Sequence, residues 1–294
     1  MSLTDSTLPG LFQAADQAAV AAQRQYLRAT GLRLFLLAAA AASGAASLRF
    51  GDPPFDAAAM VTVLALVGAA LLEIWLLVEK PEQTWYDGRA LAESAKTIAW
   101  RYAVAGAPFR KGAGEPANER TAIAELNKLL HDAPATRIEP STVSAISQAM
   151  RDLRAGGLAE RRRAYLESRI ADQQQWYTQK ARWNQRRANR WRIGILAAEF
   201  LAVMAALLRA LGVVQLDLAG IAATMVAAGA AWLAVKQHES LGRAYSFAAN
   251  ELSIIATRLQ STEDEDAWAD EVGDAEEAIS REHTMWRASR STLR

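Results

Sequence analysis

AERRRAYLESRIADQQQWYTQKARWNQRRANRWRIGILAAEFLAVMAALL, residues Ala159 to Leu208, is the stretch that decides the fold of this chain. It contains no proline and a single glycine, Gly194, so it predicts one continuous helix. The stretch is polar and aromatic up to Trp191 and almost wholly apolar from Ile193 onward. At about 1.5 Å per residue it is roughly 75 Å long, more than twice the roughly 30 Å of bilayer hydrocarbon. We therefore expect a membrane-spanning segment that continues a long cytosolic stalk.

The composition supports a helical protein without thiol chemistry. The 294 residues leave room for one large or two small domains, and only 8 are proline. The chain has no cysteine, which excludes disulfides and thiolate metal sites, and a net charge of +1 offers no argument for binding nucleic acid. The charge is segregated, with a basic excess over 80–190 and an acidic run over 263–282. We expect these two parts to face each other or a neighbouring subunit.

Four apolar runs predict four transmembrane helices arranged as two hairpins, in an all-α membrane protein whose helices continue into a cytosolic body. Asp56 is placed to cap the second run. Ser141 is placed to cap a cytosolic helix that ends at the Gly156-Gly157 pair. Ala-rich helices can also form the core of a soluble bundle, and that alternative is open. The expected spans are 32–48, 57–78, 193–208 and 218–235.

An internal repeat organises the chain. A shift of 154 residues lays Gly88-Arg89-Ala90 on Gly242-Arg243-Ala244, and Arg33 on Arg187. Each half is an entry helix, an apolar hairpin and an exit helix, although the identities are few. The predicted domains are a first two-span unit over 1–104, a cytosolic linker with two short helices over 105–157, and a second two-span unit over 158–294.

The cations predict the orientation. Each hairpin tip carries one arginine, Arg49 or Arg209, whereas the opposite ends of the runs are rich in lysine and arginine. Cytoplasmic segments carry the excess of these residues, so both termini and the middle of the chain should be cytoplasmic. The N-terminus has acids and no early basic run, which is unlike a cleaved signal peptide. At the cytoplasmic ends we expect five interface anchors, Arg33, Trp75, Arg187, Trp191 and Trp232.

Two acids lie inside the apolar runs. Glu73 and Glu199 each stand six or seven residues from the cytoplasmic edge, roughly 10 Å into the bilayer. Intramembrane acids are costly and usually face a bundle interior or a water-filled path. They are candidates for lining a cation path, and the alternatives are a pair with Arg33 or a hydrogen bond between helices.

The stalk carries a broad face of aromatic and hydrogen-bonding side chains at helical spacing. Such a face could bind a nucleotide or a partner, but it more often packs against neighbouring helices. The last helix has its own stripe from Trp268 to Trp286, which predicts that it docks on the stalk. The stalk face consists of Arg162, Tyr165, Arg169, Gln173, Trp176 and Tyr177.

Signals for catalysis are missing from the sequence. The three histidines have no second ligand at metal spacing, and no phosphate-binding loop of the GKS or GKT type occurs. We therefore expect a protein that is not an enzyme, without a cofactor, a metal site or a catalytic residue.

Three stretches carry a family resemblance: WYDGRALAESAKTIAWRYAV (85–104), RRRAYLESRIADQQQWYTQKARWN (161–184) and EEAISREHTMWRASR (276–290). With the paired hairpins they resemble the SLATT family, bacterial two-span effector domains associated with nucleotide-second-messenger conflict systems. The chain is similar to a tandem form with one domain in each half. The resemblance implies a membrane effector that forms pores in antiviral defence.

The resulting expectation is a homo-oligomeric protein of the bacterial inner membrane that opens an ion path when its cytosolic helices are triggered. Its partners would be the lipid bilayer, further copies of itself, and a nucleotide second messenger or a separate sensor protein. The alternative is a non-conducting scaffold that binds another protein through its cytosolic helices.

Overall fold

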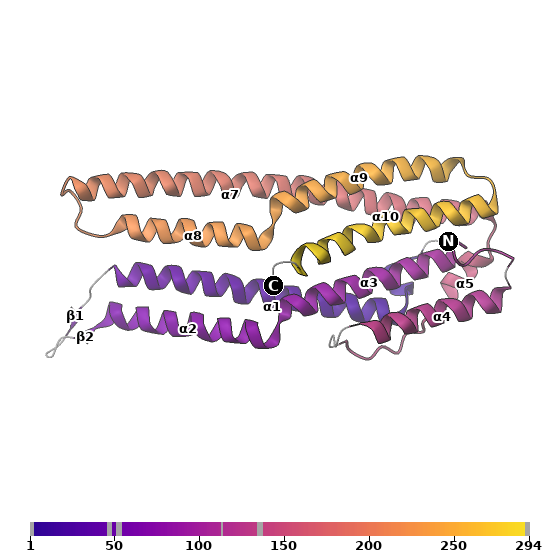
Figure 1. Cartoon of the computed structure of the whole chain (residues 1–294), viewed down its shortest axis with the longest axis horizontal. Coiled ribbons are helices and arrows are strands. Elements are labelled where there is room, and N and C mark those ends of the chain that lie inside the picture. The colour runs from indigo at the N-terminus through magenta and orange to yellow at the C-terminus, as the bar shows by residue number, and fades with distance from the viewer. Residues whose placement is uncertain (1–2, 46–48, 51–54, 113, 134–137, 292–294) are drawn as a thin grey trace. The chain divides into compact units, whose positions relative to one another are not determined.

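The computed structural model confirms an all-α protein with long helices (Figure 1). It describes residues 3–45, 49–50, 55–112, 114–133 and 138–291, with side chains for all of these except 49–50 and 281–291. Between the first two spans, β1 (Arg49–Phe50) pairs antiparallel with β2 (Phe55–Asp56). A 3-10 turn, η1 (Asp5–Thr7), precedes the first helix. The helices are α1 (Gly10–Gly44), α2 (Ala57–Glu79), α3 (Pro81–Ala103), α4 (Glu115–Asp132), α5 (Gln148–Ala155), α6 (Leu158–Tyr165), α7 (Asp172–Ala210), α8 (Leu218–Lys236), α9 (His238–Ser261) and α10 (Glu265–Ser291).

The chain divides into two compact units. One, which we call the helical body, comprises residues 1–23, 82–181 and 243–294. The other, which we call the span unit, comprises residues 24–81 and 182–242. Each apolar hairpin, α1 with α2 and α7 with α8, therefore lies in the span unit, while the outer parts of the entry and exit helices lie in the helical body.

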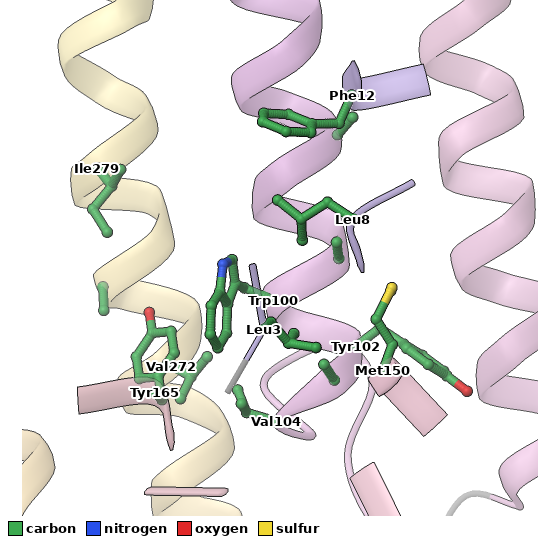
Figure 2. Packing of buried hydrophobic residues seen from close by; sticks show 14 of the residues in the cluster. Leu3, Leu8, Phe12, Trp100, Tyr102, Val104, Met150, Tyr165, Val272 and Ile279 are labelled. Atoms are coloured by element: carbon green, nitrogen blue, oxygen red, sulfur yellow. The ribbon is translucent and has the colours of Figure 1, made fainter. Parts of the chain in front are cut away.

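The helical body has a core of aromatic and small apolar side chains (Figure 2). Tyr165 stands at its centre, with the Trp100 ring 5.8 Å and the Trp268 ring 5.9 Å away in edge-on geometry. Such edge-to-face pairs stabilise beyond the area that they bury. Because these rings come from α3, α6 and α10, the core joins segments from both halves of the chain.

The last helix docks on the stalk as its apolar stripe predicts, with the Trp268 ring against Tyr165. The side chains of Trp268, Val272, Ala275 and Ile279 are buried there. The indole of Trp268 also donates to the Val104 carbonyl at 2.8 Å. The prediction is confirmed for these four residues, and the side chain of Trp286 lies outside the described part.

Opposite charges accompany this docking. Arginines from several elements pair with the acids of α10. Those within 80–190 do so as the segregation of charge predicts, whereas Arg258 lies outside that basic segment. The pairs are Arg110 with Asp266 and Asp270, Arg161 with Glu265, Arg169 with Glu276, and Arg258 with Glu271 and Asp274.

The spans begin and end with recognisable caps. Asp56 Oδ1 accepts from the amides of Ala58 and Ala59, which confirms it as the cap of α2, and Asp217 caps α8 through Gly220. Both spans end at a left-handed residue that is not glycine, Lys80 with φ 45° and Gln237 with φ 49°. A new helix starts directly after each, so each span is separated from its exit helix by one strained residue.

Three helical stretches, each made of consecutive helices, contain a segment long and apolar enough to cross a membrane, namely Ala57–Ala103 (α2 and α3), Leu158–Ala210 (α6, η2 and α7) and Leu218–Ser261 (α8 and α9). No residue in the apolar windows of the last two is buried, as expected for side chains that face lipid. The first run is not among them, because Arg33 interrupts it and the described helix ends at Gly44, while residues 46–48 lie outside the described part. A count of four spans therefore stays a prediction.

One predicted helix start is wrong. We expected Ser141 to cap the helix that ends at Gly156, but α5 begins at Gln148 and its cap is Ser147, whose hydroxyl accepts from the Met150 amide. Ile146, directly before the cap, is buried in the core of the helical body. Tertiary packing therefore holds the preceding residues in an irregular conformation that leads Ile146 inward.

Candidate functional site

Glu73 has a partner inside its own hairpin. Its carboxylate lies 2.8 Å from Arg33 Nη1, so α1 and α2 are joined by an ion pair. Both side chains are about one third exposed, at 39% and 35%. The pair with Arg33 was one of the alternatives that the sequence left open, and the structure brings these two residues together.

Glu199 lies in a different environment. It is exposed on the apolar part of α7, between Leu196 and Phe200, which are 64% and 66% exposed. Among the described residues, no cation or hydrogen-bond donor pairs with its carboxylate. An ionised side chain in hydrocarbon costs several kcal/mol unless a polar partner or water compensates it.

The predicted interface anchors lie at the ends of the two hairpins opposite their tips. Trp75 is 38% exposed, and Arg187 is exposed with its guanidinium 5.2 Å from the centre of the Trp183 ring. Trp191 and Trp232 are half-buried. The Trp232 ring lies against Gly31 of α1, so the two hairpins contact one another within one chain.

The centre of the predicted stalk face is buried. Arg169 is held by Glu276 of α10 through two hydrogen bonds, Nε to Oε1 at 2.9 Å and Nη2 to Oε2 at 2.7 Å. Tyr165 donates to Glu276 Oε1 at 3.0 Å, and Thr97 of α3 donates to Oε2 at 2.9 Å. One carboxylate thus joins α3, α6, the turn before α7, and α10.

Burial shapes the ionisation of this cluster. Burial raises the pKa of Tyr165 well above its ordinary value, and the negative charge of Glu276 adds to the shift. For Arg169, burial disfavours the charged form, but the Glu276 carboxylate outweighs this effect and the pKa of the guanidinium is raised. Arg169 and Glu276 therefore form a charged pair in an interior where their side chains are 1% and 0% exposed.

A π-helical turn, η2 (Leu166–Ala171), carries Arg169. The turn accommodates one residue more than an α-helix would, which changes the direction of the side chains on either side of it. This π-helical turn lies between α6, which supplies Tyr165, and α7. We expected one continuous helix here. The structure has a continuous helical path, but a π-helical turn takes the place of one α-helical turn.

The rest of the predicted stalk face divides between the surface and the core. Arg162 donates to the Thr262 carbonyl at 2.7 Å, and Gln173 is half-buried. Trp176 and Tyr177 pack on Tyr245 of α9, with ring centres 5.2 Å and 5.7 Å from it. The structure brings these residues into packing contacts, and binding of a ligand by the face stays a prediction.

Glu276, which joins the elements of this cluster, is not among the site residues that the sequence predicts. Its spacing could have identified it, because it lies four residues after Val272 and three before Ile279, on the apolar face of α10. Arg154 was also missed. It is 2% exposed and donates to the carbonyls of Tyr102 and Phe109 at 2.8 and 2.9 Å. No local pattern indicates that Arg154 is buried and hydrogen-bonded in this way, because its acceptors are backbone carbonyls distant in the sequence.

Within the described residues, no group of three or more histidine, aspartate or glutamate side chains is placed to hold a metal ion. His131 forms a hydrogen bond with the Asn127 carbonyl, and His238 forms one with Asn184. Ionisable side chains in the described part are used mainly in ion pairs and caps.

The fold and these clusters define a helical membrane protein built from two hairpin units with a shared helical body. A family model described as SMODS and SLOG-associating 2TM effector domain 3 matches residues 9–162, and the model for domain 1 of that description matches residues 165–286. The chain belongs to the SLATT family and carries two of its domains in tandem. No curated protein and no solved structure matches the chain.

Proposed function

We propose that this protein is a homo-oligomeric effector of the bacterial inner membrane that conducts ions when its cytosolic helices are triggered. The observation that carries the proposal is Glu199, an exposed acid without a partner on an apolar helix. Membership of a family of two-transmembrane effector domains supports the effector role. The protein acts without catalysis, and both its termini are cytoplasmic.

The two intramembrane acids differ in a way that supports a path beside α7. Arg33 neutralises Glu73, so Glu73 can remain in the bilayer at low cost. Glu199 has no such counter-ion, and a charge at the bilayer centre costs about 2.5–3.5 kcal/mol on insertion scales. A ring of copies with α7 turned to a central path would place Glu199 in water and remove this cost.

A single copy has too few spans to enclose such a path. Two hairpins give at most four helices, and these are packed on one another through Trp232 and Gly31. Several copies are therefore required, with Glu199 from each contributing one carboxylate to the lining. A ring of carboxylates favours cations over anions.

The trigger would reach the membrane through the helices that belong to both units. α7 begins in the helical body and ends in the span unit, so a displacement of one end can move the other as a rigid rod. The signal would be a nucleotide second messenger or a separate sensor protein that contacts the helical body.

The test is conductance of the purified full-length protein in a planar bilayer, compared with Glu199→Gln and Glu73→Gln. We expect single-channel steps, and we expect Glu199→Gln to reduce the preference for cations severalfold, since it removes one charge per copy from the lining. Glu73→Gln should change selectivity less, because Arg33 already neutralises Glu73. Silence from folded and inserted protein under every trigger would reject conduction.

A second candidate function is a non-conducting scaffold, favoured by one surface feature. Phe247 and Ile254 of α9 lie seven residues apart in the helical body and are 68% and 66% exposed. Exposed large apolar side chains on one helix face can mark a protein partner. If Phe247→Ser with Ile254→Ser abolishes defence in cells while conductance is unchanged, the scaffold function gains over the pore.

A further inference from the structure

The cytoplasmic base of the second hairpin holds cations without a carboxylate. Arg187 of α7 is exposed, and Lys236 is the last residue of α8. Each lies over a tryptophan, with Arg187 5.2 Å from the Trp183 ring centre and Lys236 Nζ 5.1 Å from that of Trp232. Among the described residues, no aspartate or glutamate pairs with either cation.

These cations are close enough to act on one another. The Trp183 ring beneath Arg187 lies 5.3 Å from the His238 ring, and His238 follows Lys236 by two residues, so the two helices bring these cations together. The charge of Arg187 therefore repels that of Lys236. Burial lowers the pKa of His238, and the nearby charges of Lys236 and Arg187 lower it further. His238 is only 4% exposed, and its Nδ1 lies 2.8 Å from Asn184 Oδ1, an acceptor, so Nδ1 carries the proton of the neutral ring. The base of the hairpin is thus a positive site backed by a neutral, fixed imidazole.

The nearest acid on the same helix as His238 does not neutralise the pair. Glu239 follows directly, and its carboxylate pairs with Arg192. Arg187 and Lys236 therefore repel each other without an internal counter-ion. Like charges held together in this way are unfavourable unless an anion from outside the chain lies between or beside them.

The first hairpin provides an internal comparison. Arg33 occupies the position of Arg187 in the 154-residue repeat, and it pairs with Glu73 from the neighbouring span at 2.8 Å. In the second hairpin the charged residue of the neighbouring span that acts on the arginine is a lysine, and Ala227 stands where the repeat places Glu73. One half of the protein thus supplies its own anion, whereas the other half lacks one.

The depth of the site selects the kind of anion. Lys236 ends the apolar run of α8, and Arg187 precedes Ile193 by six residues, or about 9 Å of helix. The polar headgroup layer extends roughly 5–8 Å beyond the hydrocarbon on each side, so Lys236 lies at the level of the lipid phosphates. The Arg187 backbone lies at the outer edge of this layer, and its long side chain can extend back to the phosphates. The two tryptophans are also typical of this layer.

We propose that Arg187 and Lys236 form a binding site for the headgroup phosphate of an anionic phospholipid at the base of the second hairpin. Trp183 and Trp232 orient the two cations, and His238 and Asn184 close the site on the side of the protein. The first hairpin has no equivalent site, since Glu73 occupies its arginine. The site does not depend on the protein being a pore.

The test uses the full chain in a neutral detergent and native mass spectrometry to count bound lipid during titration. The probes are phosphatidylglycerol, phosphatidylcholine and inorganic phosphate. We expect phosphatidylglycerol to bind in preference to phosphatidylcholine, and Arg187→Gln with Lys236→Gln to weaken its binding about 30-fold, as expected for two lost cations near an anionic headgroup. Excess inorganic phosphate should not displace the lipid, because it lacks the acyl chains.

A matched control carries the same change of charge. Arg182→Gln with Arg190→Gln removes two exposed cations from the same part of α7, neither paired with an acid among the described residues. This control should retain most of the binding. Equal loss in both double variants would overturn the proposal in favour of a diffuse basic surface, and displacement by inorganic phosphate would show a site for free phosphate instead.

A further variant keeps the test decisive if the double variant does not fold. Lys236→Glu gives Arg187 an internal carboxylate, as Glu73 gives Arg33, and should fold while losing the preference for phosphatidylglycerol. Retention of that preference by folded Lys236→Glu would overturn the proposal. None of these outcomes involves conductance, so they are independent of the test of the pore.

Discussion

At the scale of single residues, the helical body depends on a buried ion pair. Arg169 and Glu276 are almost wholly inaccessible, and Glu276 also accepts hydrogen bonds from Tyr165 and Thr97. Two buried charges gain little net stability as a pair, but either one alone leaves an uncompensated charge in the interior. Glu276 is therefore more important for specifying where α10 docks than for the net stability of the fold.

Glu276→Gln should destabilise the protein by about 3–5 kcal/mol, because Arg169 remains buried and charged without its partner. The measurement is denaturant unfolding in detergent, followed by tryptophan fluorescence. Glu271→Gln is the control on the same helix, where the pair with Arg258 is partly exposed and its loss should cost less than about 1 kcal/mol. Equal losses from the two variants would contradict the role assigned to burial.

A partly exposed pair predicts a pH dependence. Hydrogen bonds from Arg151 lower the pKa of Glu119, and burial opposes this shift. The positive charge of Arg151 and the hydrogen bond from the Tyr102 hydroxyl also lower the pKa of Glu119. Because the folded state binds this proton less tightly than the unfolded state, the pair contributes stability above the ordinary glutamate pKa of about 4.3 and loses it as pH falls through the lower folded value. Solvent screening limits the contribution to about 0.5–1 kcal/mol.

Arg151→Gln should therefore be less stable than the natural protein at pH 7, and the difference should shrink below about pH 4. Melting temperatures of the two proteins across this range measure the effect, and the difference between them removes the contribution of other carboxylates. If the difference in melting temperature grew on acidification, the pair would not stabilise the protein through a lowered pKa of Glu119.

At the scale of elements, the repeat places a glycine where each exit helix approaches its entry helix. A Cβ at Gly88 of α3 would lie 3.2 Å from the Ala15 carbonyl and 3.3 Å from Ala19 of α1. A Cβ at Gly242 of α9 would lie 3.3 Å from Gln185 Cγ of α7. Gly88 and Gly242, which the repeat superposes, therefore both stand where an exit helix lies close to its entry helix. The nearest atom to the added Cβ belongs to the backbone at Gly88 and to a flexible side chain at Gly242.

Gly88→Ala should cost about 1–3 kcal/mol, because the rigid backbone of α1 must move away from the new methyl group. Gly242→Ala should cost less, since Gln185 can change its rotamer. Gly194→Ala is the control, because nothing lies within 4 Å of a Cβ at that position and the higher helix propensity of alanine should stabilise α7 by up to about 1 kcal/mol. Thermal unfolding of the three variants would contradict this account if Gly88→Ala were as stable as Gly194→Ala.

At the scale of the whole molecule, the chain joins two units with different surroundings. The helical body buries aromatic rings and pairs its basic segments with the acidic α10, as a water-soluble domain does. The span unit leaves its large apolar side chains exposed, as a protein in lipid does. The distribution of cations predicts that the hairpin tips lie on the far side of the membrane from the helical body.

Single cysteines can test this topology, because the natural chain has none. Val213→Cys lies at the tip of the second hairpin and Ser253→Cys on α9, and both positions are exposed. A membrane-impermeant maleimide should label Val213→Cys in intact cells and Ser253→Cys only after lysis. The reverse result would place the termini outside the cytoplasm.

Much of the fold follows from local rules. The helices, the cap at Asp56, the apolar runs and the stripe of α10 could be predicted because hydrophobic periodicity, capping and glycine or proline signals act within a few residues. The predicted start of α5 was wrong because a tertiary contact, the burial of Ile146, outweighs the local capping signal at Ser141. For the candidate site, the residue types were predictable, but the partner of each residue was not.

The amino-acid sequence alone determined that this is a helical membrane protein of two similar halves, because the apolar runs and their flanking cations are local properties of the chain. Only the tertiary structure decided that Arg33 neutralises Glu73 and that Glu276 holds Arg169. It also decided that Glu199, Arg187 and Lys236 have no charged partner among the described residues. These differences depend on which helix faces meet, and so on contacts between residues far apart in the sequence, such as Arg169 and Glu276, which are 107 positions apart. Electrostatic energies change severalfold with such pairing and burial, so residues of the same type acquire different roles.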